Sequence, residues 1–251
     1  MAFKNFKILF FCTCWLVFSC QSNDLIVKDL TQKKIPDNLI YKGNIIEAKK
    51  WADKNGDNIL IISRYGPYRT QDPYSSDNNF GNVELYAYQY LVNNRSIVLL
   101  WESSEIIKNC PTDMWIEVFP NSTSITDLDN NGVSETTILH RYSCRGGVDP
   151  SDMKVVLHEG KQSYCLQGKM YLDYQIGKID KTTFEFNLSK ISTKNASLGG
   201  RYTNDLEFKN APPEFLAFST AKWIEYCDKD SVKQFYRADY QQTKIEDKHK
   251  P

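Results

Sequence analysis

The chain has 251 residues, with 31 basic and 31 acidic side chains, and its 13 Phe, 15 Tyr and 5 Trp suffice for a packed core. The balanced charge, without a basic stripe, argues against nucleic acid as a partner. After residue 20, no apolar stretch approaches the ~20 residues that a membrane-spanning helix needs.

The N-terminal segment is typical of a bacterial lipoprotein signal peptide. Two lysines precede an apolar run over 8–18, which is about half the length of a membrane span. The run ends in Val-Phe-Ser-Cys over 17–20, which resembles a lipobox because a small residue precedes the cleavage point and a thiol follows it. We expect removal of 1–19, acyl chains on Cys20, and a location in the bacterial cell envelope, at the outer membrane. The alternatives are a transmembrane anchor and an ordinary secretory signal.

The rest of the chain predicts one β-rich domain. Residues 20–38 are polar with little periodicity, and we interpret them as a lipidated tether. Beyond them, short apolar, β-branched and aromatic runs alternate with turn residues, which is typical of antiparallel structure. We therefore predict a single mainly β domain over 39–228, an antiparallel meander or sandwich of about eight to ten strands with one C-terminal α-helix.

Four β-hairpins are predicted from turn residues between apolar runs. Asn and Gly favour such turns because they accept positive φ. The hairpins join 44–53 to 58–63 through Asn55-Gly56, 83–92 to 96–101 through Asn93-Asn94, 113–119 to 135–142 around a polar loop, and 153–159 to 162–166 through Gly160-Lys161. A weaker strand is predicted over 183–188.

The C-terminal part predicts a helix followed by a tail. Pro212 and Pro213 precede an early acid and apolar residues near a spacing of 3.6, which indicates an amphipathic helix that reaches Cys227. Residues 229–251 are charged, and we expect them to form a disordered tail.

Four cysteines would remain without lipid after signal cleavage: Cys110, Cys144, Cys165 and Cys227. Outside the cytoplasm, an even number permits two disulfides, here in three possible connectivities. The sequence has no Cys-x-x-Cys pair, so zinc is not expected.

The third hairpin predicts one disulfide through its register. A register with two apolar pairs and one charged pair is favourable, namely Ile116–Ile138, Trp115–Leu139 and Asp113–Arg141. The same register places Cys110 opposite Cys144 and on one face of the sheet. We therefore predict a Cys110–Cys144 disulfide that closes the base of this hairpin. Cys165 and Cys227 then either pair or stay as buried thiols, and we favour thiols.

The segment 127–135 has the spacing of a calcium-binding loop. Oxygen-bearing side chains occupy positions one, three, five and nine, and a glycine at position six allows a sharp turn. Position twelve is Ile138, so the bidentate acid that closes an EF-hand loop is missing. The alternative is a loop that keeps only its shape, in which Asp and Asn turn the chain. The candidate calcium ligands are Asp127, Asp129, Asn131, Val133 and Glu135.

This loop, with predicted strands on both sides, resembles the Asp-x-Asp-x-Asn-Gly-x-x-acid loops of FG-GAP and related extracellular repeats. A wider resemblance covers most of 45–170. The chain is similar there to a family of small bacterial envelope lipoproteins labelled "surface polysaccharide biosynthesis protein", in segments 53–58, 109–111, 126–135, 142–154 and 159–162. The resemblance implies a link to surface polysaccharide, and it implies no reaction and no catalytic residues.

Residues 64–81 would form a long loop rich in Tyr, Asp, Asn and Arg. Loops beyond about 12–15 residues are usually functional or disordered. Tyr65, Tyr68 and Tyr74 are candidates for stacking on sugar rings. The alternative is a mobile surface loop that tucks a few aromatic side chains into the body.

The sequence contains none of the common catalytic motifs, and its central histidines, His140 and His158, lie on predicted strands. We therefore expect a lipid-anchored binding or assembly module linked to surface polysaccharide. Its expected partners are a membrane, through the lipid, and a glycan or other envelope proteins. The alternatives are a glycan-modifying hydrolase, whose carboxylate pair only the fold would bring together, and a purely structural lipoprotein.

Overall fold

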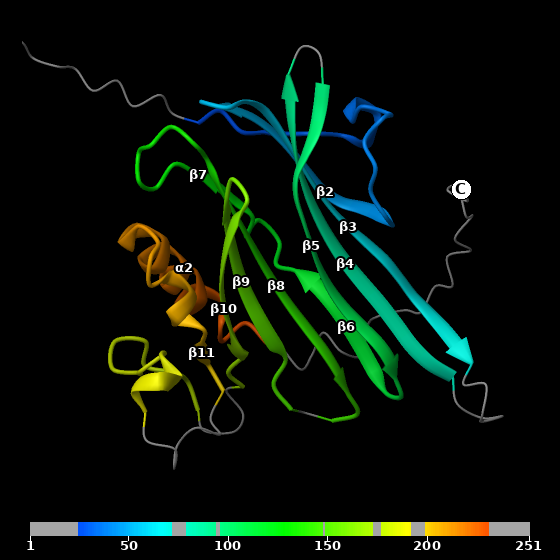
Figure 1. Cartoon of the computed structure of the whole chain (residues 1–251). Helices are drawn as coiled ribbons and strands as arrows, with labels where there is room; N and C mark the ends of the chain where they lie inside the picture. The colour runs from blue at the N-terminus through cyan, green and yellow to red at the C-terminus, as the bar shows by residue number, and fades with distance from the viewer. Residues whose placement is uncertain are drawn as a thin grey trace, which may run out of the picture.

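Two antiparallel β-sheets pack face to face, and one α-helix covers the free face of the second sheet (Figure 1). The computed structural model describes residues 25–71, 79–93, 96–147, 149–172, 177–191 and 199–230. The prediction of a mainly β, antiparallel fold with a C-terminal helix is confirmed.

The chain builds the first sheet as a meander and then turns into the second. The first sheet follows chain order, with β1 (Lys28–Asp29), β2 (Asn44–Asp53), β3 (Gly56–Gln71), β4 (Asn79–Asn93) and β5 (Ser96–Cys110). The second has the order β11-β10-β9-β8-β6, and β7 also pairs with β8. Its strands are β6 (Asp113–Val118), β7 (Ser124–Thr126), β8 (Glu135–Arg145), β9 (Asp152–Glu159), β10 (Gln162–Lys169) and β11 (Arg201–Thr203).

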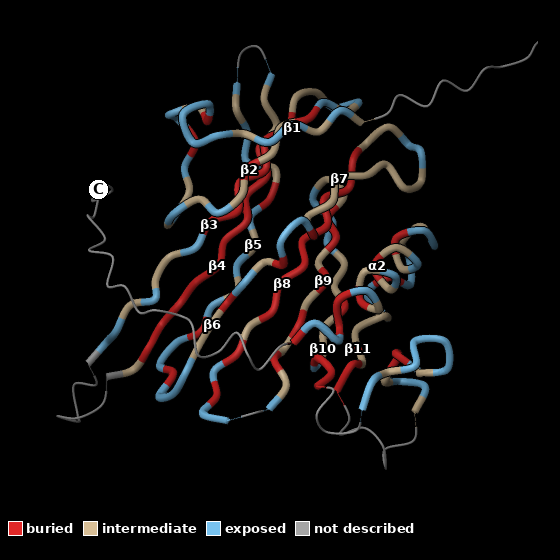
Figure 2. Tube along the Cα trace, turned by 180° about the vertical axis from the view of Figure 1, so that it is seen from behind, coloured by how far each residue is buried: buried red, intermediate tan, exposed pale blue. Residues whose placement is uncertain are grey.

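Side-chain alternation along the strands divides the interior into layers. Leu60 and Ile62 of β3 pack between the sheets, whereas Ile59 and Ile61 pack on the outer face of the first sheet. Figure 2 shows the resulting runs of buried residues along β4 and β8. A third cluster lies between the second sheet and the helix.

The helix α2 (Pro213–Tyr226) begins with proline at its first position, as predicted. Phe215 and Trp223 are completely buried against the second sheet, in one cluster with Leu157 and Leu166. Burial of a side chain such as Phe215 contributes about 1.5–3 kcal/mol. In the described part of the chain, no helix combines the length and the apolar character needed to cross a membrane.

The strands of all four predicted hairpins pair with each other. Asp53 pairs with Gly56, so the turn between β2 and β3 consists of Lys54 and Asn55, one residue earlier than predicted. Gly56 has φ 126°, a conformation that only glycine adopts without strain. The Asn-Gly signal thus identified the hairpin but not its turn residues.

The turns β9–β10 and β4–β5 can also be compared with the turn residues predicted from the sequence. Gly160 has φ 54° between β9 and β10, as its predicted place at the start of the turn requires. β4 and β5 meet where Asn93 pairs with Ser96, and the predicted turn residue Asn94 lies outside the described residues.

The register of the third hairpin was predicted wrongly. The structure replaces Ile116–Ile138, Trp115–Leu139 and Asp113–Arg141 by Ile116–Tyr142, Trp115–Ser143 and Asp113–Arg145. The cause is the short strand β7, which pairs with the first residues of β8 and leaves the later part of β8 for β6. Because the shift is even, each side chain keeps its predicted face.

Cys110 and Cys144 form the predicted disulfide, with their Cα atoms 5.7 Å apart. Its place in the fold differs from the prediction, because Cys110 ends β5 in the first sheet while Cys144 lies on β8 in the second. The bridge therefore ties the two sheets together and does not close a hairpin. Cys165 and Cys227 are free thiols, half-buried and buried respectively.

The long loop predicted over 64–81 is wrong, because β3 and β4 extend through most of it as a two-stranded arm. A β-bulge between Tyr65 and Tyr68 accommodates Pro67, since a bulge does not need the ladder hydrogen bond that proline cannot donate. Tyr65 and Tyr68 thus lie on a strand, and Tyr74 lies outside the described residues.

The weak strand predicted over 183–188 is also wrong. This segment makes one isolated bridge, between Asn187 and Tyr202, and leads into the 3-10 helix Leu188–Lys190. Phe184 and Phe186 pack against the cluster under α2, so their alternation reflects burial from a loop. The strand β11 takes the edge position beside β10.

The segment assigned to the tether, 20–38, belongs to the body from Leu25 onward. Lys28 pairs with Lys50 in a short strand, and Ile35 is buried on the outer face of the first sheet. Isolated apolar residues in a polar segment produce no periodicity, so the sequence pattern did not reveal this docking. The described part of this segment therefore packs along the first sheet and does not act as a free tether.

The predicted tail, 229–251, begins with a residue that belongs to the body. Asp230 is buried, and its carboxylate accepts hydrogen bonds from the Ser151 backbone N–H at 2.7 Å and the Arg141 guanidinium at 3.2 Å. Residues 231–251 lie outside the described residues.

Candidate functional site

The acidic loop joins β7 to β8 at one end of the sandwich (Figure 1). Thr126, the last residue of β7, pairs with Glu135, the first residue of β8, so two strands close the loop. The strand β8 begins where it was predicted, whereas the short strand β7 was not predicted. Asn130 and Gly132 have φ 58° and 84°, and the chain reverses there in the left-handed region that Asn and Gly tolerate.

Side-chain oxygens shape the loop by accepting backbone hydrogen bonds. Asp127 Oδ2 accepts from the N–H of Gly132 at 3.1 Å. Asp129 Oδ1 accepts from the N–H of Asn131 at 3.1 Å, and Asn131 Oδ1 accepts from that of Val133 at 2.7 Å. Such local turns are what Asp and Asn commonly form, so they explain the shape of the loop without a ligand.

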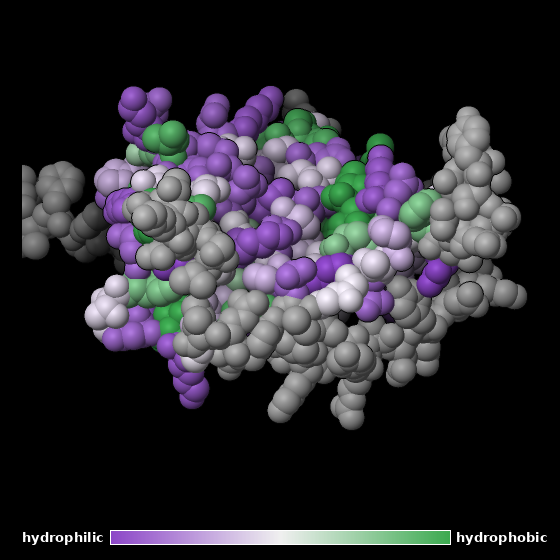
Figure 3. All heavy atoms as spheres, turned by 90° about the horizontal axis from the view of Figure 1, so that it is seen from below, coloured by the Kyte–Doolittle hydropathy of each residue, from purple (hydrophilic) through white to green (hydrophobic). Residues whose placement is uncertain are grey.

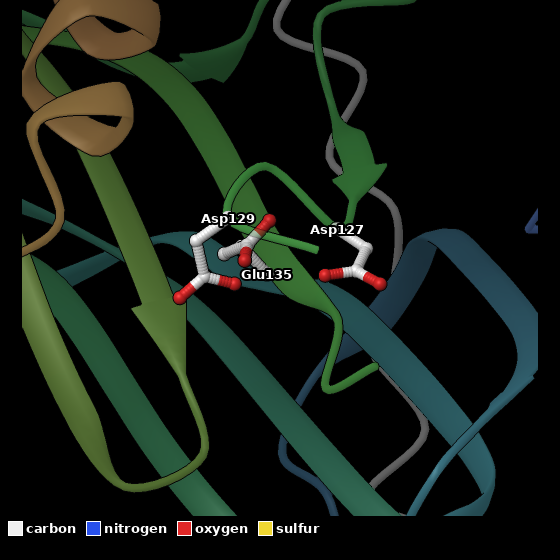
Figure 4. Close-up of side chains that lie close together, drawn as sticks. All are labelled: Asp127, Asp129 and Glu135. Carbon is white, nitrogen blue, oxygen red and sulfur yellow. The ribbon is translucent and has the colours of Figure 1, made fainter. Parts of the chain in front are cut away.

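Three carboxylates converge inside this loop (Figure 4). Asp127, Asp129 and Glu135 each place one oxygen within 4.8 Å of the others. The structure thus brings together three of the five predicted ligands. The Asn131 amide instead donates to Asp129 Oδ2 at 3.0 Å and to Glu159 Oε1 at 2.5 Å.

Glu135 is the buried member of this group. Its Oε2 accepts hydrogen bonds from the Thr126 hydroxyl and the Leu128 N–H, both at 2.9 Å. Its Oε1 and the buried Oδ1 of Asp127 have no hydrogen-bond partner among the described residues. Burial, opposed by these hydrogen bonds and reinforced by the charge of Asp129, raises the pKa of Glu135 to about 7.

The donor set suits a hard divalent cation. Ca²⁺ takes six to eight oxygen ligands and prefers carboxylates and carbonyls, whereas structural zinc prefers Cys and His. The acid at position nine, Glu135, is directed into the loop, while Ile138 at position twelve is buried between the sheets. The three acids would hold Ca²⁺ without a closing bidentate acid, and part of its coordination would stay open.

The first sheet supports the loop from the side. The Lys54 N–H donates to the Gly132 carbonyl at 2.8 Å. Trp51 Nε1 donates to Ser134 Oγ at 2.6 Å, and Ser134 donates to Asp53 Oδ2 from its hydroxyl at 2.7 Å and from its N–H at 3.1 Å. The loop therefore connects the two sheets at one end of β8, and the disulfide connects them at the other.

Two of the predicted sugar-stacking residues, Tyr65 and Tyr68, lie on the outer face of the first sheet. The half-buried rings of Tyr65 and Tyr68 are 5.2 Å apart, and Lys42 Nζ lies 4.7 Å from the Tyr65 ring centroid. The Tyr68 hydroxyl donates to Glu84 at 2.6 Å. Burial opposes ionisation of Glu84, but hydrogen bonds from Lys42, Tyr68 and Tyr86 hold its pKa below the usual value.

A second polar cluster, which the sequence pattern did not reveal, lies between the sheets. Glu105 on β5 accepts from Lys154 Nζ on β9 at 2.5 Å and lies 3.4 Å from His140 Nε2 on β8. Burial opposes ionisation of Glu105, but its contacts with His140 and Lys154 lower its pKa. Glu105 and His140 border a small hollow with Ser103 and Ser104. Residues on three separate strands give no spacing signal in the sequence.

Comparisons of this chain with protein-family models, with curated proteins and with solved structures found no match. The resemblance to the envelope lipoprotein family thus stays a prediction from the sequence.

Proposed function

We propose that this is a lipid-anchored protein of the bacterial cell envelope whose sandwich serves as a binding or assembly module, and that its loop 127–135 binds one Ca²⁺. The lipobox before Cys20 supports the anchor, although Cys20 lies outside the described residues. The disulfide between Cys110 and Cys144 supports an oxidising compartment, where such bonds persist.

One observation carries the calcium proposal. Glu135 Oε1 and Asp127 Oδ1 are buried carboxylate oxygens that receive no hydrogen bond from the described part of the chain, and both residues converge with Asp129 in one loop. An unpaired buried carboxylate is costly, and like charges in one site raise that cost. A divalent cation between them would satisfy the free oxygens and offset the repulsion.

The burial of Glu135 also separates this proposal from the hydrolase alternative. A buried carboxyl with a raised pKa has the chemistry of a general acid. Glu135, however, is 0% exposed, and one of its carboxylate oxygens lies within 4.8 Å of oxygens of Asp127 and Asp129 inside the loop. A general acid must reach the oxygen of the leaving group within hydrogen-bond distance. The geometry therefore favours a metal site.

We propose a cell-surface glycan as the partner of the module. This rests on the family resemblance and on Tyr65, whose half-buried ring lies beside the exposed Lys42 on the outer face of the first sheet. An aromatic face with a cationic neighbour can stack on a sugar ring and donate to its hydroxyls. Tyr65→Ala should weaken binding of the purified protein to surface polysaccharide. Unchanged binding would show that Tyr65 is not part of the glycan site.

Thermal unfolding of chelator-treated protein tests the calcium site. Ca²⁺ should raise the melting temperature of the wild type, since a ligand at 100 times its Kd stabilises the folded state by about 2.7 kcal/mol. Asp127→Ala and Glu135→Gln should abolish the rise. Glu102→Gln, which removes an exposed acid from β5, is the matched control and should keep it. A wild type that does not respond to millimolar Ca²⁺ would contradict the proposal.

A further inference from the structure

The short distance along the chain between lipid and body restricts how the sandwich can sit on a membrane. Only four residues separate Cys20 from Leu25, and Leu25 packs against the hydrophobic cluster between the sheets. Five residue steps span at most about 18 Å even when fully extended. If Cys20 carries lipid, as we propose above, the body cannot move freely above the bilayer, and the end that contains Leu25 must lie near its surface.

The strand register identifies that end. β1 runs antiparallel to β2, with Lys28 opposite Lys50, so the chain before β1 leads back toward the turn between β2 and β3. We call this region the loop end and define it as residues 53–56, 127–134 and 159–161. Its parts contact one another through the Lys54–Gly132 hydrogen bond and the Asn131–Glu159 hydrogen bond. In Figure 1 the start of the described chain, drawn in blue, lies beside the loop between β7 and β8.

Exposed apolar side chains occur near the same end. Ile26, next to Leu25, is 70% exposed, and Val98 near the start of β5 is 50% exposed. The turns β2–β3 and β4–β5 lie side by side, because Asp57 pairs with Val92. The described part of the opposite end, seen from below in Figure 3, is mostly hydrophilic and carries separate hydrophobic patches. Apolar side chains beside an anchor can enter the interfacial region of a bilayer.

The charge of the loop end conflicts with a membrane position in the absence of metal. It carries four acids, Asp53, Asp127, Asp129 and Glu159, and two lysines, Lys54 and Lys161. Next to anionic headgroups this net negative charge is repulsive. A bound Ca²⁺ would offset it. Three acids also provide fewer oxygens than the six to eight that Ca²⁺ takes, so phosphate oxygens could complete its coordination.

We propose that the loop end rests on the bilayer, and that Ca²⁺ held by Asp127, Asp129 and Glu135 binds the phosphate groups of anionic phospholipids. The contact is therefore calcium-dependent and selective for anionic lipid. It fixes the orientation of the sandwich, with the arm of β3 and β4 and its Tyr65 directed away from the anchor along the strands.

The lipidated full-length mature protein in vesicles of phosphatidylcholine and phosphatidylglycerol tests this proposal. A fluorescent amino acid replaces Asn55 at the loop end or Gly147 at the opposite end, and lipids with nitroxide headgroups act as quenchers. With Ca²⁺, quenching at position 55 should be several-fold stronger than at position 147. A chelator, Asp129→Ala, or vesicles of phosphatidylcholine alone should reduce the difference, and Glu102→Gln should leave it unchanged.

The possible failures can be told apart. Protein that does not float with the vesicles would refute the lipid anchor, and this inference with it. Protein that floats but is quenched equally at both positions, or more at position 147, would refute the inference and leave the anchor intact. The difference in quenching between positions 55 and 147 could also persist unchanged in chelator and on neutral vesicles. That result would show that the short chain between Cys20 and Leu25 alone sets the orientation, and it would overturn the calcium contact.

Discussion

Trp101 and His158 stack face to face between the two sheets, with ring centroids 3.8 Å apart and planes 7° from parallel. The Trp101 Nε1 donates to Gln89 at 3.0 Å, but both ring nitrogens of His158 are buried without a hydrogen-bond partner among the described residues. Burial lowers the pKa of His158 to about 4. The imidazole is therefore neutral in the folded protein at neutral pH and serves as an aromatic core residue.

His158 should make the fold sensitive to acid. The unfolded chain takes up a proton near pH 6.5, whereas the folded protein resists protonation until about pH 4, so stability falls as pH decreases through this window. The full loss at pH 4 is about 3 kcal/mol. His158→Phe keeps the stack and removes the proton site. Urea unfolding between pH 7.5 and pH 4 should show that the variant loses less free energy of unfolding than the wild type. An equal loss in the two proteins would contradict this explanation.

The disulfide between Cys110 and Cys144 should stabilise the packing of the two sheets. It closes a separation of 34 residues, and the entropic model gives a stabilisation of about 3–4 kcal/mol for such a loop. Replacing both cysteines with alanine should lower the urea midpoint accordingly. Cys165→Ala, which removes a free half-buried thiol, is the control. Peptide mapping without reductant that links Cys110 to another cysteine would contradict the assignment.

Several features of the fold could be predicted because they depend on local chemistry. The turn at Gly160 and the acidic spacing from Asp127 to Glu135 are encoded within a few residues, so the sequence alone located them. The disulfide was predicted through a register that was wrong by an even number of residues. That error kept Cys144 on its face of the sheet, which is why the pairing survived it.

The remaining features depend on contacts between segments far apart in the chain. The sequence does not show that Glu135 is buried, because its burial comes from the packing of β8 between β7 and β9. The stack of Trp101 on His158 joins β5 to β9 and leaves no spacing signal. The arm over 64–81 was mistaken for a loop because Gly and Pro, which usually end strands, lie at its bulge, and Pro and Asn also occur in the sequence between its two strands.

Ser134 should couple the acidic loop to the first sheet. Ser134→Ala would leave the buried Trp51 Nε1 without its acceptor and remove a donor from Asp53, which costs about 1–3 kcal/mol. Ser124→Ala is the matched control, because the Ser124 hydroxyl donates to the nearby Ser122 carbonyl and, within the described residues, makes no hydrogen bond to the first sheet. Denaturant unfolding in chelator measures the loss. The carboxylates remain in Ser134→Ala, so Ca²⁺ should still raise its melting temperature, and equal stability of the two variants would contradict the coupling.

Cys20 should determine whether the protein stays with the membrane. Its thiol must accept the diacylglyceryl group before the signal peptide is removed, so Cys20→Ala should accumulate as an unprocessed precursor without acyl chains. Two or more acyl chains give durable attachment at about 0.8 kcal/mol per buried CH₂, and the variant should lose it. Cys14→Ala changes a cysteine inside the same apolar run and should be processed normally. Intact mass and membrane flotation of the three proteins measure the outcome. A Cys20→Ala protein with the mature mass and full flotation would show that another feature holds the chain to the membrane.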